Sequence, residues 1–337
     1  MGRLIGGRLL AALPGVIGVI IVSFVLTRAL PGDPAAYFAG PAATQQAIAE
    51  IRHSLGLDRS LAEQFIVYVD DLAHGRLGNS LSTGQPVIAE LLTRLPASIE
   101  LTVLALLLSV AIAVPLGITA AQRPNSWIDH LCRIVSTAGV SLPTFFTGLL
   151  LVYVFYYLLG WAPAPLGRLD LVYSPPPART GFYLVDSLLV GDGSTTIAAL
   201  RQITLPALTL AIFTLAPIAR MTRAAMLSVL SSDFIRAARA NGLARRSIIY
   251  VYAFRNAMLP VLTTLGMVFS FLLGANVLVE KVFAWPGIGS YAIEALIASD
   301  YAPVQGFVLA MALVYILLNL LIDILYGLID PRAAVTA

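Results

Sequence analysis

Six apolar stretches constrain this chain of 337 residues more than any other feature, because each is near the roughly 20 residues that a helix needs to cross a bilayer. Lipid offers no hydrogen-bond partner to an open sheet edge, and the alternating pattern of a membrane barrel is absent, so each stretch is expected to be helical. The sequence therefore predicts an all-α polytopic membrane protein with about six transmembrane helices. The expected spans are Leu9–Leu26, Leu101–Ala121, Ile134–Leu159, Ile203–Ala219, Met258–Val279 and Val304–Ile322.

Composition supports this reading. Hydrophobic residues make up 58% of the chain and charged residues only 12%, whereas a soluble domain averages about 25% charged residues. The net charge of +3 is small, and a nucleic-acid-binding protein would gather its cations into a groove without lipid-length apolar runs. The single cysteine, Cys132, excludes an intrachain disulfide.

The arginines predict the orientation. Seven of them lie between Arg220 and Arg255, against the single acid Asp233, so the positive-inside rule places this segment in the cytoplasm. Arg3 and Arg8 precede the first span, which resembles a signal peptide but lacks a clear cleavage site, and residues 1–30 are therefore expected to form a retained transmembrane helix. Counting the spans places both termini in the cytoplasm.

Two long segments are then external. Residues 31–96 contain a helical pattern over Ala43–Leu72 that Gly56 interrupts, which predicts two short helices on the membrane surface. Residues 161–202 are rich in proline and glycine and are expected to form an ordered loop or a lobe that binds a partner.

Catalytic and metal-binding patterns are missing from the sequence. The only lysine, Lys281, lacks the glycine frame of a nucleotide-binding P-loop, so any ATP energy must come from another subunit. His53, His74 and His130 are scattered over the chain, and with one cysteine they predict no metal site and no nucleophilic catalysis. A transport subunit without enzyme activity is favoured over an intramembrane enzyme, and an ATP-independent channel or scaffold remains the alternative of a different class.

The segment 231–257, between the fourth and fifth spans, is the part of the chain whose sequence indicates a functional contact. Ser231 or Ser232 is expected to cap a short helix, Asp233 favours its positive end, and Gly242 suits the left-handed turn after it. Phe234, Ile235 and Ala238 would form its apolar face. Small residues would let a soluble partner approach closely, whereas the alternative is a basic loop that pairs with anionic lipid; these small residues are Ala237, Ala238, Ala240 and Gly242.

A family resemblance favours a soluble partner over anionic lipid as the contact of this segment. The runs Asp233-Phe234-Ile235-Arg236, Ala237-Ala238-Arg239-Ala240-Asn241-Gly242-Leu243 and Arg255-Asn256-Ala257-Met258-Leu259-Pro260 resemble the cytoplasmic coupling loop of bacterial ABC importer permeases, in the dipeptide/oligopeptide (peptide/nickel) branch. Glu280-Lys281-Val282-Phe283-Ala284-Trp285-Pro286-Gly287-Ile288-Gly289 is similar to the family's extracytoplasmic element after the fifth span. The general importer loop begins with Glu-Ala-Ala, whereas this chain has Arg236-Ala237-Ala238, so the glutamate's role does not carry over.

The resemblance implies a type I ABC importer transmembrane fold over residues 97–330, in the bacterial cytoplasmic membrane. It implies coupling to an ATPase through Asp233, Arg236, Ala237, Ala238, Ala240, Gly242 and Leu243, and an external role for Glu280, Phe283, Trp285, Pro286, Gly287 and Gly289. The implied partners are a second homologous permease, two cytoplasmic ATPases that bind ATP and magnesium, an external substrate-binding protein and membrane lipid, with no nucleic acid. Peptide is the expected solute, and nickel chelates, glutathione or oligosaccharides are alternatives within the family.

Overall fold

The computed structural model describes residues 2–29, 33–40, 42–139 and 141–329, and in these residues every regular element is a helix. Within the described residues, four helices are long and apolar enough to cross a membrane. The first and third predicted spans correspond to shorter apolar helices at Leu13–Ala29 and Thr144–Leu158. The prediction of an all-helical membrane protein is therefore confirmed. The chain divides into two compact units, residues 1–97 with 286–317 and residues 98–285 with 318–337.

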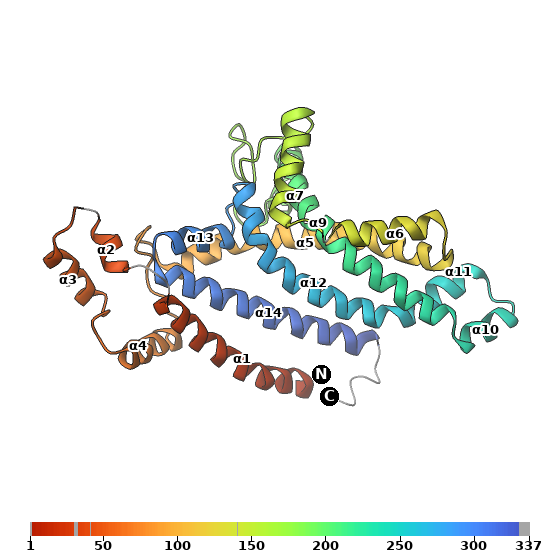
Figure 1. Ribbon diagram of the computed structural model, residues 1–337, viewed down its shortest axis with the longest axis horizontal. Helices are drawn as coiled ribbons and strands as arrows, with labels where there is room; N and C mark the ends of the chain where they lie inside the picture. Colours follow the sequence, from red (N-terminus) through yellow and green to blue (C-terminus); the bar gives the residue numbers. More distant parts are fainter. Residues whose placement is uncertain (1, 30–32, 41, 140, 330–337) are drawn as a thin grey trace. The chain divides into compact units, whose positions relative to one another are not determined.

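The first unit contains the start of the chain and most of its last helix (Figure 1). Its elements are α1 (Gly2–Ala29), α2 (Pro34–Ala39), α3 (Gln45–Ser54), α4 (Leu61–Ala73), the beginning of α5 (Val87–Gln122), α13 (Ile288–Ile297) and most of α14 (Tyr301–Ile329). Val87 and Leu91 of α5 pack against Ile288 and Tyr291 of α13 in its buried core.

The two short helices expected in residues 31–96 are present as α3 and α4. Gly56 lies between them with a φ of 64°, a left-handed conformation that glycine adopts without steric cost. Ser60 and Glu63 form a capping box that fixes the start of α4. Phe65 and Tyr68 of α4 pack against Phe24 of α1, so α4 is attached to the first helix by aromatic contacts.

The second unit is built around α9 (Gly193–Leu230) and α12 (Phe254–Val282), which pack along each other. The end of α5, α6 (Trp127–Ala138), α7 (Thr144–Leu151) with the π-helical turn η1 (Val152–Leu158), and α8 (Tyr183–Val190) complete its main part. The segment between α9 and α12 contains α10 (Asp233–Ala240), α11 (Arg245–Ser247) and the π-helical turn η2 (Ile248–Ala253).

Small residues let these helices approach closely. A Cβ atom added to Gly117 of α5 would lie 2.7 Å from the Thr222 Cβ atom of α9. Ser109 of α5 donates to the Ala211 carbonyl oxygen of α9 at 3.1 Å and contacts the Thr214 hydroxyl. Close contacts between small residues and hydrogen bonds between helices are the usual means of packing helices in a membrane, where lipid is as apolar as leucine.

The third predicted span, Ile134–Leu159, is not one continuous helix. It is divided between the end of α6 and the α7–η1 segment, with a break before Thr144. Pro143 explains the break, because proline has no N–H to donate and disfavours helical backbone at the residue before it. The Ser141 hydroxyl donates to the Thr137 carbonyl oxygen at 2.7 Å and so satisfies one of the groups at the break.

Candidate functional site

The predicted short helix of segment 231–257 is present as α10, and its ends differ in how they are fixed. Asp233 lies in the first turn as expected, but the Ser232 side chain does not cap the helix. The Ser232 hydroxyl donates instead to the Val229 carbonyl oxygen, at 2.5 Å, and thereby binds the end of α9. The expected serine cap was therefore wrong, because the hydroxyl is used by the preceding helix.

The end of α10 is closed by a left-handed glycine. Gly242 has a φ of 74°, and its N–H donates to the Arg239 carbonyl oxygen at 3.0 Å while the Leu243 N–H donates to the Ala238 carbonyl oxygen at 3.2 Å. This pair of hydrogen bonds is a Schellman motif, which requires left-handed backbone at the glycine position. The turn predicted at Gly242 is confirmed.

One side of α10 is buried in the second unit. Ile235 is completely buried and Ala238 nearly so, in a cluster with residues from the ends of α5, α9 and α12 and from η2. The other members of this cluster are Ile118, Ala121, Met226, Ile248, Ile249, Ala253 and Ala257. The cluster holds α10 against the ends of the long helices. Figure 1 shows α10 at the end of α9.

The opposite side of α10 and its turn are exposed. Phe234 was expected on the apolar face beside Ile235, but it is 44% exposed, because neighbouring positions on a helix point about 100° apart. Ala238 was expected to face a partner, but it points into the core cluster. The exposed side contains the remaining predicted coupling residues, namely Asp233, Arg236, Ala237, Ala240, Gly242 and Leu243, together with Phe234.

A cavity of about 650 Å³ adjoins this turn. Leu227, Leu230 and Ile248 contribute apolar side chains to it, while Arg239 and Arg245 contribute cations. Leu243, at the end of the Schellman motif, also lines it. An apolar cavity with a cationic rim beside an exposed helix suits a partner that presents an apolar side chain flanked by acids.

An ion pair that sequence reasoning missed joins α6 to α9. Asp129 of α6 is buried and accepts from the guanidinium group of Arg223 of α9, with one contact at 3.0 Å. Asp129 also accepts from the Asn125 N–H at 2.9 Å and so fixes the turn between α5 and α6. The Arg223 hydrogen bond lowers the pKa of Asp129 to about 2, so the carboxylate stays ionised. The Ser126-x-x-Asp129 spacing, which matches a helix cap, was the available signal.

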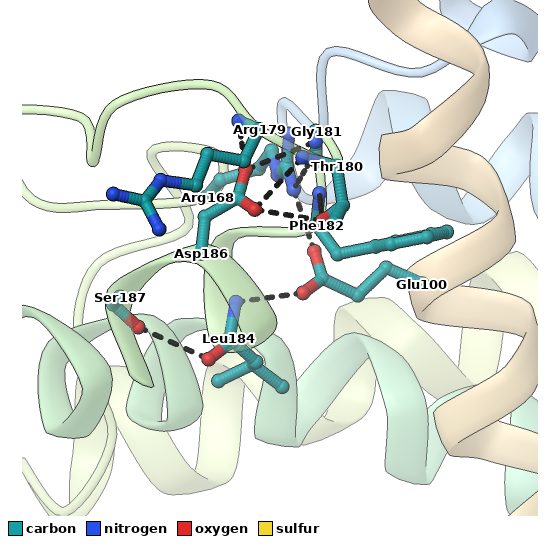
Figure 2. A network of polar contacts seen from close by, with 9 residues as sticks. All are labelled: Glu100, Arg168, Arg179, Thr180, Gly181, Phe182, Leu184, Asp186 and Ser187. Atoms are coloured by element: carbon teal, nitrogen blue, oxygen red, sulfur yellow. Dashed lines mark hydrogen bonds and ion pairs between the residues drawn. The ribbon is translucent and has the colours of Figure 1, made fainter. Parts of the chain in front are cut away.

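The segment 161–202, which we predict to be external and call the external segment, is an ordered structure that buried charges hold in place (Figure 2). Glu100 of α5 accepts from Arg168 at 2.6 Å and from the Leu184 N–H at 2.8 Å. Arg168 also donates to the Gly181 carbonyl oxygen at 2.8 Å, and its guanidinium group lies 3.5 Å from the centre of the Tyr183 ring. The ordered loop predicted here is present over residues 161–182, whereas α8 and the start of α9 occupy most of residues 183–202.

Asp186 of α8 completes the network. Its carboxylate accepts from the Thr180 hydroxyl at 2.7 Å and from the N–H groups of Thr180 and Gly181, each at 2.9 Å. In the same segment, Leu171 and Val172 are 89% and 86% exposed. The base of this loop is fixed by buried polar contacts, while its tip presents apolar side chains to solvent.

The predicted external element after the fifth span is mostly buried. Ser98 donates to Glu280 at 2.5 Å, and the Phe283 carbonyl oxygen accepts from the Gly167 N–H at 3.1 Å, which joins the end of α12 to the loop. Trp285 is 2% exposed. Among the remaining predicted residues, Pro286 is exposed whereas Gly287 and Gly289 are buried. Phe283 therefore supports the loop. In the described part of the chain no group of three or more His, Cys, Asp or Glu residues is placed to bind a metal.

Comparison with known proteins gives matches over both halves of the chain. Residues 113–335 match the family described as "Binding-protein-dependent transport system inner membrane component", and residues 1–102 match its N-terminal counterpart. The chain is 46% identical, over 94% of its length and 93% of the relative's, to the "Probable D,D-dipeptide transport system permease protein DdpB" of Escherichia coli (strain K12). It is 44% identical, over 97% of each chain, to the "Di/tripeptide transport system permease protein DppB" of Pseudomonas aeruginosa (strain UCBPP-PA14).

Proposed function

The chain belongs to the family of binding-protein-dependent transport system inner membrane components, and from that premise we propose that it carries short peptides across the bacterial cytoplasmic membrane. It is a permease subunit of an ABC importer, and a non-enzymatic transport subunit. The observation that carries the peptide assignment is the identity of 44% over 97% of both chains to a di/tripeptide permease. Similar identity to a D,D-dipeptide permease supports the same class of solute.

Uptake by intact cells tests the solute. Cells that lack this chain are expected to lose most uptake of a radiolabelled dipeptide, and expression of the chain should restore it. Uptake of nickel chelates, glutathione and an oligosaccharide, measured in the same cells, is expected to be unchanged. Normal dipeptide uptake without the chain, together with a loss for one of the other solutes, would contradict the assignment.

The energy for transport is proposed to come from partner ATPases that bind ATP and magnesium and contact the exposed side of α10. Three features support this role. The buried side chains of Ile235 and Ala238 attach α10 to the second unit. Its exposed side carries the small residues Ala237 and Ala240, and an apolar cavity adjoins its turn. An exposed helix with small residues allows a partner's groove to approach its backbone closely. The arginine-rich sequence around it supports a cytoplasmic position.

A charge on the exposed side of α10 tests this contact. Ala237 is exposed, so Ala237→Glu is expected to leave the folding of α10 unchanged. In the complex it would bury an unpaired carboxylate in the ATPase groove at a cost of several kcal/mol. The variant should enter the membrane and pair with its sister permease but lose the ATPase subunits on purification. Ala49→Glu, at an exposed position of α3, is the matched control and should retain them. Retention of the ATPases by Ala237→Glu, with normal uptake, would contradict this contact and favour the alternative, in which the segment pairs with anionic lipid.

The external loop is proposed to receive the substrate-binding protein. Its base is fixed by Glu100, Arg168 and Asp186, so the exposed Leu171 and Val172 are presented with little conformational freedom left to lose on docking. Replacing both tip residues by serine should weaken binding-protein-stimulated ATP hydrolysis without changing the basal rate. Ile66→Ser, at an exposed apolar position of α4, is the control. Unchanged stimulation in the double variant would exclude the tip from docking.

A further inference from the structure

The first unit contains a cavity of about 370 Å³ that none of the roles above uses. The end of α1, the α3–α4 pair, the residues just before α5 and the start of α14 surround it. Five charged residues line it, namely Arg28, Arg59, Asp71, Arg76 and Asp300. The volume lies in the range of small-molecule sites, and charges of both signs on its walls are unusual for a cavity that serves packing alone.

Asp300 has a buried oxygen that the described residues leave without a partner. The side chain is 1% exposed, and its Oδ2 atom accepts from the Ser80 hydroxyl at 2.7 Å and from the Ser82 N–H at 3.0 Å. The Oδ1 atom is buried and makes no hydrogen bond in the part of the chain that the structure describes. A buried carboxylate oxygen without a donor is costly, and Asp300 lines the cavity, so a ligand ammonium group that displaces the side chains covering Oδ1 at the cavity wall would satisfy this atom.

Arg28 supplies the opposite charge. Its guanidinium group is held by the Gln64 side-chain oxygen at 3.3 Å and the Thr27 hydroxyl at 3.1 Å, and it lies 5.6 Å from the centre of the Tyr301 ring. Its partners within the described ranges include no carboxylate. Asp71 and Arg76, in contrast, pair with each other at 2.9 Å and neutralise one another.

We propose that this cavity binds a small zwitterion, a free dipeptide, with its ammonium group on Asp300 and its carboxylate on Arg28. Tyr301 follows Asp300 directly in the chain and its ring lies beside the Arg28 guanidinium group, so both charges border one part of the cavity. Hydrogen bonds between charged partners are about twice as strong as neutral ones. The proposal rests on the peptide function proposed above and adds a second peptide site on the permease, in addition to the path through the membrane.

Direct binding tests the site. The assembled transporter, in nanodiscs and without its binding protein, is titrated with radiolabelled dialanine. Asp300→Asn, which preserves shape and an acceptor for Ser80, is expected to weaken binding by about tenfold or more. Glu50→Gln, at an exposed acid of α3 outside the cavity, is the matched control and should bind like the unmodified transporter.

Modified ligands, compared on the unmodified transporter and on the two variants, show which end of the dipeptide each residue binds. N-acetyl-dialanine lacks the ammonium group, so it should bind weakly to the unmodified transporter and lose nothing further in Asp300→Asn. Dialanine amide lacks the carboxylate, so it should bind weakly to the unmodified transporter and no more weakly to Arg28→Gln. Equal binding of dialanine and both modified ligands, or no dialanine binding at all, would overturn the proposal.

Uptake separates this proposal from the peptide function. If dialanine fails to bind the transporter without its binding protein while cells still import it through this chain, the second site is absent and the function stands. If cells import no dipeptide through the chain, the proposed function itself fails.

Discussion

The two segments proposed to contact partners are held to the second unit by opposite kinds of interaction. The segment around α10 is attached through Ile235 and Ala238, apolar side chains that fill a pocket at the ends of the long helices. The external segment is attached through Glu100, Arg168 and Asp186, buried charged groups whose hydrogen bonds reach backbone atoms of the loop.

This difference has mechanical consequences. Apolar contacts have no fixed direction, so α10 can tilt or slide while it keeps most of its buried area. Hydrogen bonds between buried charges are directional, and losing one partner leaves the other without compensation. The α10 attachment therefore suits a part that moves with an ATPase, and the external attachment suits a part that stays fixed while another protein docks.

The largest expected effect is at Glu100. Glu100→Ala leaves the Arg168 guanidinium group buried without its carboxylate, which should destabilise the external segment by roughly 3–5 kcal/mol. Hydrogen exchange at the backbone N–H groups of Thr180, Gly181 and Leu184 measures the loss. Glu100→Gln, which keeps an acceptor, should show a smaller increase in exchange. Unchanged exchange in Glu100→Ala would show that the charges do not hold this segment.

Ile235→Ala is expected to come next. It removes the most deeply buried side chain of α10 and should cost roughly 2–4 kcal/mol, since the surrounding helix ends cannot fully close the cavity. Faster hydrogen exchange confined to α10 and its turn would report this. Phe234→Ala, at the exposed neighbour, should leave exchange nearly unchanged, and equal effects of the two variants would contradict the assigned orientation of α10.

A smaller effect is expected at Gly242. A Cβ atom there meets open space, so the cost of Gly242→Ala comes from the left-handed backbone alone, about 1–2 kcal/mol. Asparagine tolerates this conformation better than alanine, so Gly242→Asn should cost less. Exchange at the Leu243 N–H, the last hydrogen bond of the motif, distinguishes the two variants. If both behave like the unmodified protein, the turn is not strained by a side chain.

The smallest effect is expected at Arg236. It pairs with Asp233 on the surface of α10, where the two side chains are 73% and 86% exposed. Solvent screens such a pair, so Arg236→Gln should change the stability of α10 by less than about 1 kcal/mol. A large loss of ATPase binding with unchanged exchange in α10 would identify Arg236 as a contact residue, whereas a large change in exchange would contradict the picture of apolar attachment.

Local signals allowed much of the α10 segment to be predicted from the sequence. The turn at Gly242 and the acid at the helix start depend on neighbours within a few residues, and both are present. The direction of Phe234 was predicted wrongly because the core cluster takes its other members from the ends of α5, α9 and α12 and from η2. Which side of a short helix is buried is decided by these residues outside the helix.

The external segment was less predictable. Proline and glycine indicated an ordered loop, but nothing local links Glu100 to Arg168 or Leu184, which are 68 and 84 positions away in the chain. The cavity residues Arg28 and Asp300 are even further apart in sequence. Polar contacts of this kind depend on the tertiary arrangement, and no pattern of hydrophobic spacing encodes them.

The break in the third span bears on how this protein is made. A Cβ atom at Gly139, beside the break, would lie 2.6 Å from the Ile212 carbonyl oxygen of α9, so the chain fits there only because glycine allows α9 to come so close. Backbone groups freed by a break at membrane depth must be covered by protein, because hydrocarbon cannot hydrogen-bond them. Here the covering helix is synthesised about 70 residues later. The third span is therefore expected to remain incompletely inserted during translation, and to settle in the bilayer together with α9.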